Sequence, residues 1–405
     1  MHQQKIFIAI VPMKKRQKLF NTALKAPRVG LVGVILPTQK KAATIAHLKE
    51  LAALARTAQM QVVDTFMQKL DKVHTNTLIG KGKVAEIGQF IQEHKIDRII
   101  FDDEVSPAQA KNLEKAWKCE VWDRSLLILK IFALHARTVQ AKTQVALAQY
   151  QYLLPRLTGM WTHHSRQQGG VGLRGGPGEK ELETDRRLAQ QKIKLLKKKL
   201  AHMSTIAKTQ RKQRQQQLNV ALVGYTNAGK STLMRCLSKE EVFVADQLFA
   251  TLSPTVRQVV IKDISFLLAD TVGFIRKLPH TLVACFKSTL AEVQEADVLL
   301  HVVDFSHDDY EAHIHIVHQI LKEIEAQNVP IILVLNKEDQ AIAKQQAKAK
   351  NSGIPMSEAV FLEAERVRLS HLYACPVIYC SAIYKKHIQQ LQAAIYRTLK
   401  QKRPQ

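Results

Sequence analysis

Residues 224–231 combine residue types and a spacing that can hold the phosphates of a nucleotide. They follow a short apolar run, 220–223, and precede the helical sequence 232–237. In such a loop the glycines let backbone N–H groups turn toward phosphate oxygens, and the helix N-terminus adds partial positive charge. Lys230 would lie against the β- and γ-phosphates, and the Ser231 hydroxyl would coordinate Mg²⁺. The predicted phosphate-binding residues are Gly224, Tyr225, Thr226, Asn227, Ala228, Gly229, Lys230 and Ser231.

A second motif, Asp270, Thr271, Val272 and Gly273, comes at the end of the apolar run 264–269. Asp270 would hold Mg²⁺ through water, and the Gly273 amide would face the γ-phosphate. Such a pair can report whether the γ-phosphate is present, because switch segments are ordered by it and released after hydrolysis. We therefore expect Gly273 to take part in catalysis together with Lys230.

Asn336, Lys337, Glu338 and Asp339 follow the buried-strand sequence 330–335, in a pattern that recognises guanine. The Asp339 carboxylate can accept hydrogen bonds from N1–H and the exocyclic amine of guanine, whereas adenine lacks that pair of donors. Lys337 can lay its stem across the base, and Asn336 can tie this loop to the phosphate-binding loop. The sequence therefore predicts GTP as the nucleotide.

Two further stretches complete the expected site. The strand-like sequence 377–380 ends at Cys380, after which Ser381 and Ala382 would offer backbone amides to guanine O6. Residues 249–255 have no helical periodicity, and a threonine there can supply a second hydroxyl to Mg²⁺; Thr251 and Thr255 both fit. The predicted site includes Phe249, Ala250, Thr251, Leu252 and Ser253 from this stretch.

The elements that must position these residues alternate between strand and helix patterns from 218 to 400, which predicts a doubly wound P-loop domain. The same alternation occurs over residues 29–122. There we expect strands at 30–36, 61–66, 98–101 and 120–122, and helices at 41–58, 83–93 and 107–117. This pattern predicts a parallel sheet covered on both faces. Its Gly-Lys-rich turn, 79–83, is either a phosphate site or a plain helix-entry turn.

The region between, 123–217, has a different periodicity. It predicts one long helix capped by Asp123 and stopped by Pro155, then a second from about Glu179 to Gln216, folded back as an antiparallel hairpin. The connecting loop, 159–178, holds seven of the chain's 16 glycines. Its Trp161, Arg166 and Arg174 offer stacking faces and cationic donors suited to RNA.

Charge gathers in the same region. Residues 137–217 carry 17 Lys and Arg against 4 Asp and Glu, a net of +13 out of +25 for the chain. A solvated helix face usually mixes charge signs, so we favour nucleic-acid binding over that alternative. The candidate RNA-binding residues of the second helix are Arg186, Arg187, Lys197, Lys198 and Lys199.

Composition excludes other classes of protein. With 405 residues and 46% hydrophobic content, the chain has room for two or three globular domains. No apolar run approaches the length of a membrane-spanning helix, so we expect no membrane insertion and a cytoplasmic location. Five scattered cysteines predict neither a zinc site nor a disulfide framework. Residues 1–28 are a basic leader, solvated or in contact with a polyanion.

The motifs together resemble those of HflX-type GTPases. The resemblance rests on 78–84, 153–159, 169–179, 182–187, 224–232, 246–252 and 270–276, and it covers nearly everything after residue 28. It implies an N-terminal α/β domain and helical hairpin that bind the large (50S) ribosomal subunit, with the loop 159–178 reaching ribosomal RNA. It also implies a role in splitting or rescuing stalled ribosomes. By the same resemblance Thr251, rather than Thr255, is the second Mg²⁺ ligand and a catalytic residue.

The expected reaction is GTP hydrolysis by in-line attack of water, in a protein that we expect to be monomeric when free. Many relatives place a water-orienting glutamine where this chain has Phe274, so we expect slow turnover that a partner accelerates. Two alternatives remain open. The protein can act by occupying the ribosome in its GTP state, with hydrolysis serving release. It can also be a helicase-like RNA-remodelling protein with ATPase activity in the N-terminal domain.

Overall fold

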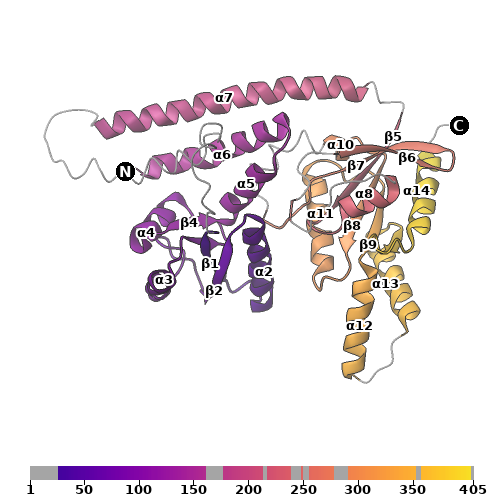
Figure 1. Cartoon of the computed structure of the whole chain (residues 1–405), viewed down its shortest axis with the longest axis horizontal. Helices are drawn as coiled ribbons and strands as arrows, with labels where there is room; N and C mark the ends of the chain where they lie inside the picture. Colours follow the sequence, from indigo (N-terminus) through magenta and orange to yellow (C-terminus); the bar gives the residue numbers. More distant parts are fainter. Residues whose placement is uncertain are drawn as a thin grey trace. The chain divides into compact units, whose positions relative to one another are not determined.

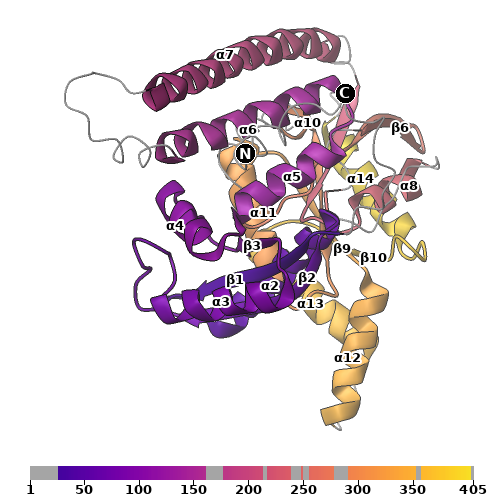
Figure 2. The ribbon, with the colours of Figure 1, turned by 60° about the vertical axis from the view of Figure 1, so that its left-hand side comes forward.

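The structure, a computed structural model, describes residues 26–160, 177–212, 217–238, 248–249, 255–277, 291–352 and 357–402. The chain divides into two compact units, each with its own sheet (Figures 1 and 2). One comprises the chain up to Leu134 together with Val145–Lys197, and the other comprises His135–Gln144 and the chain from Lys198 onward. None of the helices in these described ranges is long and apolar enough to span a membrane.

The first unit contains a four-stranded sheet with the order β2-β1-β3-β4 and parallel pairing throughout, as the sequence predicts. Its strands are β1 (Arg28–Ile35), β2 (Gln61–Lys69), β3 (Arg98–Phe101) and β4 (Glu120–Asp123), and its helices are α2 (Lys41–Thr57), α3 (Lys81–His94) and α4 (Pro107–Trp117). Figure 1 shows α2 on one side of this sheet and α3 and α4 on the other. Both faces are therefore covered, which explains why β1 reads as a continuous apolar run.

Local signals fix the helix starts in this unit. Ser106 forms a capping box with Gln109 at the start of α4, and Pro107 occupies the first turn. At the start of α3 the Gly80 amide donates to Gln68 Oε1 at 2.9 Å. The turn 79–83 is thus a helix entry whose first amide is engaged by the protein, which is one of the two alternatives that the sequence left open.

The helical region differs from its prediction in two places. The first long helix is in fact two, α5 (Arg124–His135) and α6 (Val139–Met160), and Pro155 lies inside α6 instead of ending it. Asp123 Oδ1 accepts from the Leu126 amide at 2.8 Å, so the predicted cap is confirmed. Thr138 caps α6, since its Oγ1 accepts from the Ala141 amide at 3.1 Å. This second cap explains the break that hydrophobic periodicity did not reveal.

The second predicted helix of the hairpin is α7 (Pro177–Lys212), which is 36 residues long. It begins with proline, whose missing N–H is harmless in the first turn of a helix. α6 and α7 lie alongside each other in both views and run in opposite directions (Figures 1 and 2). The predicted loop 159–178 falls mostly on residues 161–176, outside the described residues.

The second unit contains a six-stranded sheet with the order β10-β9-β8-β5-β7-β6. Its strands are β5 (Leu218–Gly224), β6 (Thr255–Ile261), β7 (Ile264–Asp270), β8 (Val298–Asp304), β9 (Ile331–Asn336) and β10 (Val377–Cys380). Only the edge strand β6 is antiparallel among these strands. The described helices are α8 (Lys230–Ser238), α10 (Ala291–Gln294), α11 (Tyr310–Glu323), α12 (Glu338–Ser352), α13 (Glu358–Tyr373) and α14 (Ile388–Lys402).

Separate apolar clusters cover the two faces of this sheet. Leu233 of α8 and Leu391 of α14 pack on one face, whereas Ile314 of α11 and Leu369 of α13 pack on the other. The predicted doubly wound fold is therefore confirmed. In such a sheet the carboxyl ends of neighbouring parallel strands meet at one edge, and that edge is where ligands bind. Here the edge brings together the ends of β5, β7, β8 and β9.

Candidate nucleotide-binding site

Two glycines shape the loop that leaves β5. Gly224 has φ +151°, and a Cβ there would lie 2.1 Å from the carbonyl oxygen of Val302 on β8. Gly229 has φ +94°, and a Cβ there would lie 2.2 Å from Asn336 Nδ2. Both positions combine a left-handed backbone with a close approach, so only glycine fits. The loop is thereby held tightly against β8 and β9.

Lys230 opens α8 and is buried, with 7% of its surface exposed. Its Nζ donates to the carbonyls of Gly224 at 3.1 Å and Tyr225 at 2.9 Å. Burial lowers the pKa of Lys230 to about 8, although the charge of Asp270 acts in the opposite direction. A buried ammonium that bonds neutral carbonyls would gain from an anionic ligand, and a phosphate is such a ligand.

Ser231 and Asp270 form a pair of oxygen donors beside this lysine. Ser231 Oγ donates to Asp270 Oδ2 at 2.6 Å, and Asp270 is 1% exposed at the end of β7. A hydroxyl and a carboxylate held this close are the hard oxygen ligands that Mg²⁺ prefers. The donor set therefore fits the predicted metal. Thr251, the third predicted ligand, lies outside the described residues.

The segment after Asp270 is fastened to the phosphate-binding loop. Thr271 Oγ1 donates to the Leu222 carbonyl at 2.6 Å. A Cβ on Gly273 would lie 2.9 Å from Thr226 Cα and 3.1 Å from Lys230 Nζ, so glycine is required by close contact. Gly273 thus lies directly beside the lysine that would hold the γ-phosphate. Its predicted contact with that phosphate is compatible with this position.

Asn336 links the phosphate-binding loop to the strand ends near the predicted base site. Its Nδ2 donates to the Ala228 carbonyl at 2.8 Å, and its Oδ1 accepts from the Ala382 amide at 3.0 Å. The tie predicted for Asn336 is therefore confirmed. The Ser381 amide donates to the Lys386 carbonyl at 3.3 Å. Because both amides have protein partners here, their contact with guanine O6 stays a prediction.

Lys337 and Glu338 of the predicted guanine site have partners, Asp304 and His387, that the sequence did not indicate. Lys337 Nζ donates to Asp304 Oδ2 at 2.7 Å, and the other oxygen of Asp304 accepts from the amide and hydroxyl of Ser306. Buried Glu338 pairs through Oε2 with His387 Nδ1 at 2.9 Å. Asp304 ends a buried strand, as Asp270 does, and that position could have identified it. His387 carries no comparable signal in the sequence.

The other predicted residues divide between described and undescribed parts of the chain. Phe249 is buried, whereas Ala250, Thr251, Leu252 and Ser253 lie outside the described residues. Of the candidate RNA-binding residues, Trp161, Arg166 and Arg174 also lie outside them. The candidates on α7, namely Arg186, Arg187, Lys197, Lys198 and Lys199, are all exposed.

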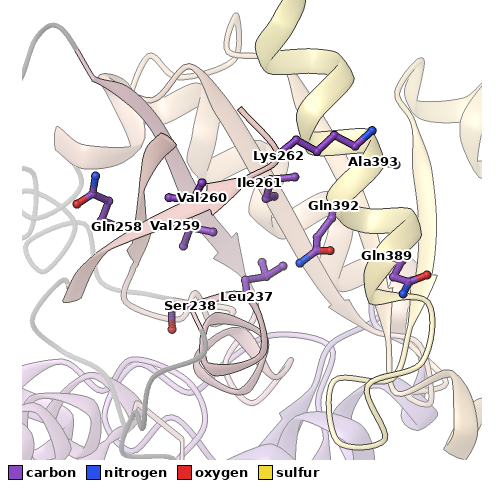
Figure 3. Close-up of a pocket in the computed structure, with 10 residues that line it drawn as sticks. All are labelled: Leu237, Ser238, Gln258, Val259, Val260, Ile261, Lys262, Gln389, Gln392 and Ala393. Carbon is purple, nitrogen blue, oxygen red and sulfur yellow. The ribbon is translucent and has the colours of Figure 1, made fainter. Parts of the chain in front are cut away.

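A separate hollow lies away from this site, between β6, α14 and the far end of α8 (Figure 3). It is lined by Leu237, Ser238, Gln258, Val259, Val260, Ile261, Lys262, Gln389, Gln392 and Ala393. None of these is a predicted site residue. Since Lys230 begins α8 and the hollow adjoins its other end, the two places are distinct.

The fold and the site define a P-loop GTPase. Residues 46–133 match a family described as GTP-binding GTPase N-terminal, residues 135–214 match GTP-binding GTPase Middle Region, and residues 219–337 match 50S ribosome-binding GTPase. The chain belongs to the HflX family of GTPases, which confirms the resemblance seen in its motifs. It is a GTP hydrolase.

Individual relatives cover most of the chain. The GTPase HflX of Flavobacterium psychrophilum is 53% identical over 309 residues, which are 76% of this chain and 75% of that protein. The GTPase HflX of Escherichia coli K12 is 44% identical over 298 residues, 72% of this chain and 69% of that protein. Among solved structures, a GTP-binding protein from Sulfolobus solfataricus in complex with GDP is 25% identical, with a TM-score of 0.46. That match covers 93% of this chain and 100% of the other.

Proposed function

We propose that this GTPase binds the large ribosomal subunit, hydrolyses GTP to GDP and phosphate there, and splits or rescues stalled ribosomes or aids subunit homeostasis. The observation that supports this most is the combination of the phosphate-binding site with α7, a long helix that exposes five of the predicted basic contacts. The family description of residues 219–337 as a 50S ribosome-binding GTPase adds support. Ribosomal RNA is then the polyanion, and the cytoplasm is the place of action.

The hydrolytic site would work by orienting GTP and by stabilising negative charge. Lys230 would bind the β- and γ-phosphates, and the Gly273 amide would bind the γ-phosphate from the other side. Ser231 and Thr251, with Asp270 through water, would hold Mg²⁺, and the bound ion would supply positive charge beside the phosphate oxygens. Phe274 follows Gly273 and is buried, with an aromatic ring that cannot hydrogen-bond to a water. The free protein should therefore turn over slowly.

The nucleic-acid surface would be the α6–α7 hairpin. Arg186 and Arg187 lie near one end of α7, and Lys197–Lys199 lie more than two turns further along. Together with the loop 159–178 they would contact RNA phosphates and unstacked bases. The domain assignment that follows is a basic leader at 1–28, an N-terminal α/β domain at 29–122, a ribosome-binding hairpin at 123–217 and a G domain at 218–400. The free protein would be a monomer.

The test is GTP hydrolysis at physiological salt, with and without purified large ribosomal subunits. The wild type is compared with a variant in which Lys197, Lys198 and Lys199 are changed to glutamate. We expect subunits to accelerate the wild type and to accelerate the variant far less, because reversing three charges opposes binding to phosphates. Basal rates without subunits should agree, since α7 is not part of the GTP site.

A matched control reverses three other exposed lysines, Lys348, Lys350 and Lys400, on α12 and α14. This control should retain full stimulation if α7 is the binding surface. Equal rates for all proteins, with and without subunits, would refute the ribosomal part of the proposal. The GTP site would stand in that case, because basal hydrolysis measures it separately.

A further inference from the structure

Tyr225 belongs to the phosphate-binding loop, and its side chain is buried, with 5% of its surface exposed. Its ring stacks on His313 of α11, with centroids 3.8 Å apart and planes 7° from parallel. Its hydroxyl oxygen accepts from the Arg276 amide at 2.9 Å, and Arg276 Nε lies 3.4 Å from the same oxygen. One side chain of the phosphate-binding loop thus contacts both the segment after Gly273 and a helix on the face of the sheet.

Backbone hydrogen bonds join the same segments. The Thr226 amide donates to the Phe274 carbonyl at 2.8 Å, and the Phe274 amide donates to the Gly224 carbonyl at 3.1 Å. Tyr225 lies between these two bonds, and its own carbonyl accepts from Lys230 Nζ. Residues 274–276 are therefore attached to the loop by two backbone bonds and by the tyrosine hydroxyl. Gly273 immediately precedes this attached segment.

We propose that Tyr225 is a positioning residue for the γ-phosphate: it holds residues 273–276 in place through Arg276 and connects their position to α11 through His313. This role rests on the proposed contact between the Gly273 amide and the γ-phosphate. If Tyr225 holds Gly273 in place for that contact, the tyrosine contributes to the affinity for GTP. GDP has no γ-phosphate, so its affinity is independent of Tyr225. This difference separates a positioning role from simple packing, which would affect both nucleotides.

The stack persists at neutral pH because His313 stays uncharged. Burial lowers the pKa of His313 to about 3, the neighbouring charges of His307 and Arg276 act in the same direction, and Asp304 opposes them. Two neutral rings can lie in parallel contact without a charge being desolvated between them. α11 is thereby linked to the loop by a contact that does not depend on the proton concentration in this range.

The decisive variant is Tyr225→Phe, which keeps the ring and removes only the hydroxyl. Full-length protein is titrated with a fluorescent GDP and with a fluorescent nonhydrolysable GTP analogue. We expect affinity for the GTP analogue to fall about 3- to 10-fold, the range that corresponds to one lost hydrogen bond. Affinity for GDP should stay within about twofold of wild type, because the remaining contacts of the loop are unchanged.

Two variants of His313 test the second half of the proposal. His313→Ala removes the stack and should lower the GTP-analogue affinity in the same selective way. His313→Phe restores an aromatic ring and should return the ratio of the two affinities toward the wild-type value. A His313→Ala variant with an unchanged ratio would show that α11 is not connected to the site through this ring.

The control is Tyr379→Phe on β10, whose hydroxyl donates to the Leu362 carbonyl at 2.9 Å within the same unit. It loses a comparable buried hydrogen bond and should leave both affinities unchanged. Equal weakening of GDP and GTP analogue in Tyr225→Phe, or no weakening of either, overturns the positioning role. If the wild type bound neither nucleotide, the nucleotide site itself would fail, and that outcome is distinct from the others.

Discussion

Each of the two sheets has an edge formed by the carboxyl ends of its parallel strands, and the charged groups at these two edges are paired differently. In the first sheet, Asp102 follows β3 and Asp123 ends β4, and each carboxylate pairs with an arginine: Arg124 Nη1 lies 2.7 Å from Asp102 Oδ1, and Arg156 Nη2 lies 2.7 Å from Asp123 Oδ2. In the second sheet the buried cation is Lys230, which donates to two backbone carbonyls. In the described part of the chain no carboxylate is paired with it.

This difference separates a structural edge from a binding edge. Polar groups converge at the carboxyl ends of parallel strands in both sheets. Where the protein supplies both signs of charge, the groups satisfy one another and the edge contributes to the fold. Where the buried cation bonds only backbone carbonyls in the described structure, although the carboxylate of Asp270 lies nearby, an anionic ligand can supply the partner that the cation lacks. A phosphate site of this kind can therefore be recognised by a buried lysine that has no carboxylate bonded to it.

Lys230→Met tests the comparison most severely. It should abolish measurable GTP binding, a loss of about 3–6 kcal/mol for two charge-assisted hydrogen bonds to phosphate. The nucleotide-free protein should become slightly more stable. Burying the ammonium costs the wild type about 3 kcal/mol, because the pKa falls from 10.5 to about 8, and the variant avoids this cost. The variant in turn leaves two carbonyls without their donor, which destabilises it by about 1 kcal/mol each.

Calorimetric titration with GTP and urea unfolding without nucleotide measure the two quantities. The sign of the pH dependence provides a check. A lysine pKa that is lower in the folded state makes folding more favourable as pH rises from about 8 toward 10.5, and the variant should lack this rise. A variant clearly less stable than wild type at neutral pH would mean that Lys230 serves the fold as Arg124 does.

Asp123→Ala should have the opposite effect, since it breaks the first sheet's edge and leaves GTP binding alone. Asp123 is buried and accepts from the Tyr152 hydroxyl and the Leu126 amide, each at 2.8 Å, as well as from Arg156. Removing one partner of a buried pair costs about 3–5 kcal/mol. Urea unfolding followed by tryptophan fluorescence should show this loss.

Tryptophan fluorescence reports on the unit that contains the first sheet, because Trp117 belongs to α4 and Trp122 to β4; the remaining tryptophan is Trp161. GDP affinity should stay within about twofold of wild type, because distant sites act independently. Asp71→Ala, an exposed position in the same unit, is the matched control and should unfold like wild type. Loss of GDP binding in Asp123→Ala alone would show that the two edges are not independent.

Acid should destabilise the second unit more than the first. Burial lowers the pKa of His301 on β8 well below its ordinary value, and lowers that of His313 to about 3. A depressed histidine pKa gives stability that is present above pH 6.5 and is lost as pH falls. Between pH 7.5 and 5.5 each ring should remove about 1.4 kcal/mol. In the first unit, burial raises the pKa of Glu114, which acts in the other direction.

Hydrogen exchange at the two pH values measures each unit separately. Protection of β5 and β8 should fall more than that of β1 and β3. His301→Leu should reduce the difference, because both ring nitrogens of His301 lack a hydrogen-bond partner in the described structure and an apolar side chain suits that place. If both sheets lost protection equally on acidification, the buried histidines would not explain the acid response.

Sequence reasoning predicted the strands and most helices of both sheets because buried parallel strands are strongly apolar and the helix caps carry local signals. It also brought Lys230, Asp270 and Asn336 to one site, since Asp270 and Asn336 end strands and Lys230 follows the loop that leaves β5. The break between α5 and α6 was missed because Phe132 and Val139, on either side of it, are seven residues apart, a spacing that also fits one continuous helix. Pro155 was misinterpreted as a stop, although it lies inside α6; an interior proline removes one helix hydrogen bond and can kink a helix without ending it.

The contacts of Asp304, His313 and His387 could not be predicted in the same way. Each depends on pairing between segments far apart in the chain. Asp304 reaches Lys337 because β8 and β9 are in register at Asp304 and Asn336, and register is invisible in a single strand. His313 lies on the buried face of an amphipathic helix, where a histidine gives no indication that a tyrosine will stack on it.

The smallest expected effect sharpens the comparison at the guanine end of the second sheet. There a carboxylate and a lysine of the protein do pair, Asp304 with Lys337, each about one-fifth exposed. The pair would orient the lysine stem across the base. Asp304→Asn should therefore weaken the affinity for GTP and GDP alike by about fivefold, close to 1 kcal/mol. Titration with both nucleotides measures this, and Asp308→Asn, an exposed carboxylate paired with Lys344, is the control.

Because the base is common to both nucleotides, a selective effect on GTP would place Asp304 with Tyr225 at the γ-phosphate instead. An equal effect would assign the pair to the base, and the second sheet would then contain both kinds of edge, with internal pairing at the base and a missing anion at the phosphates.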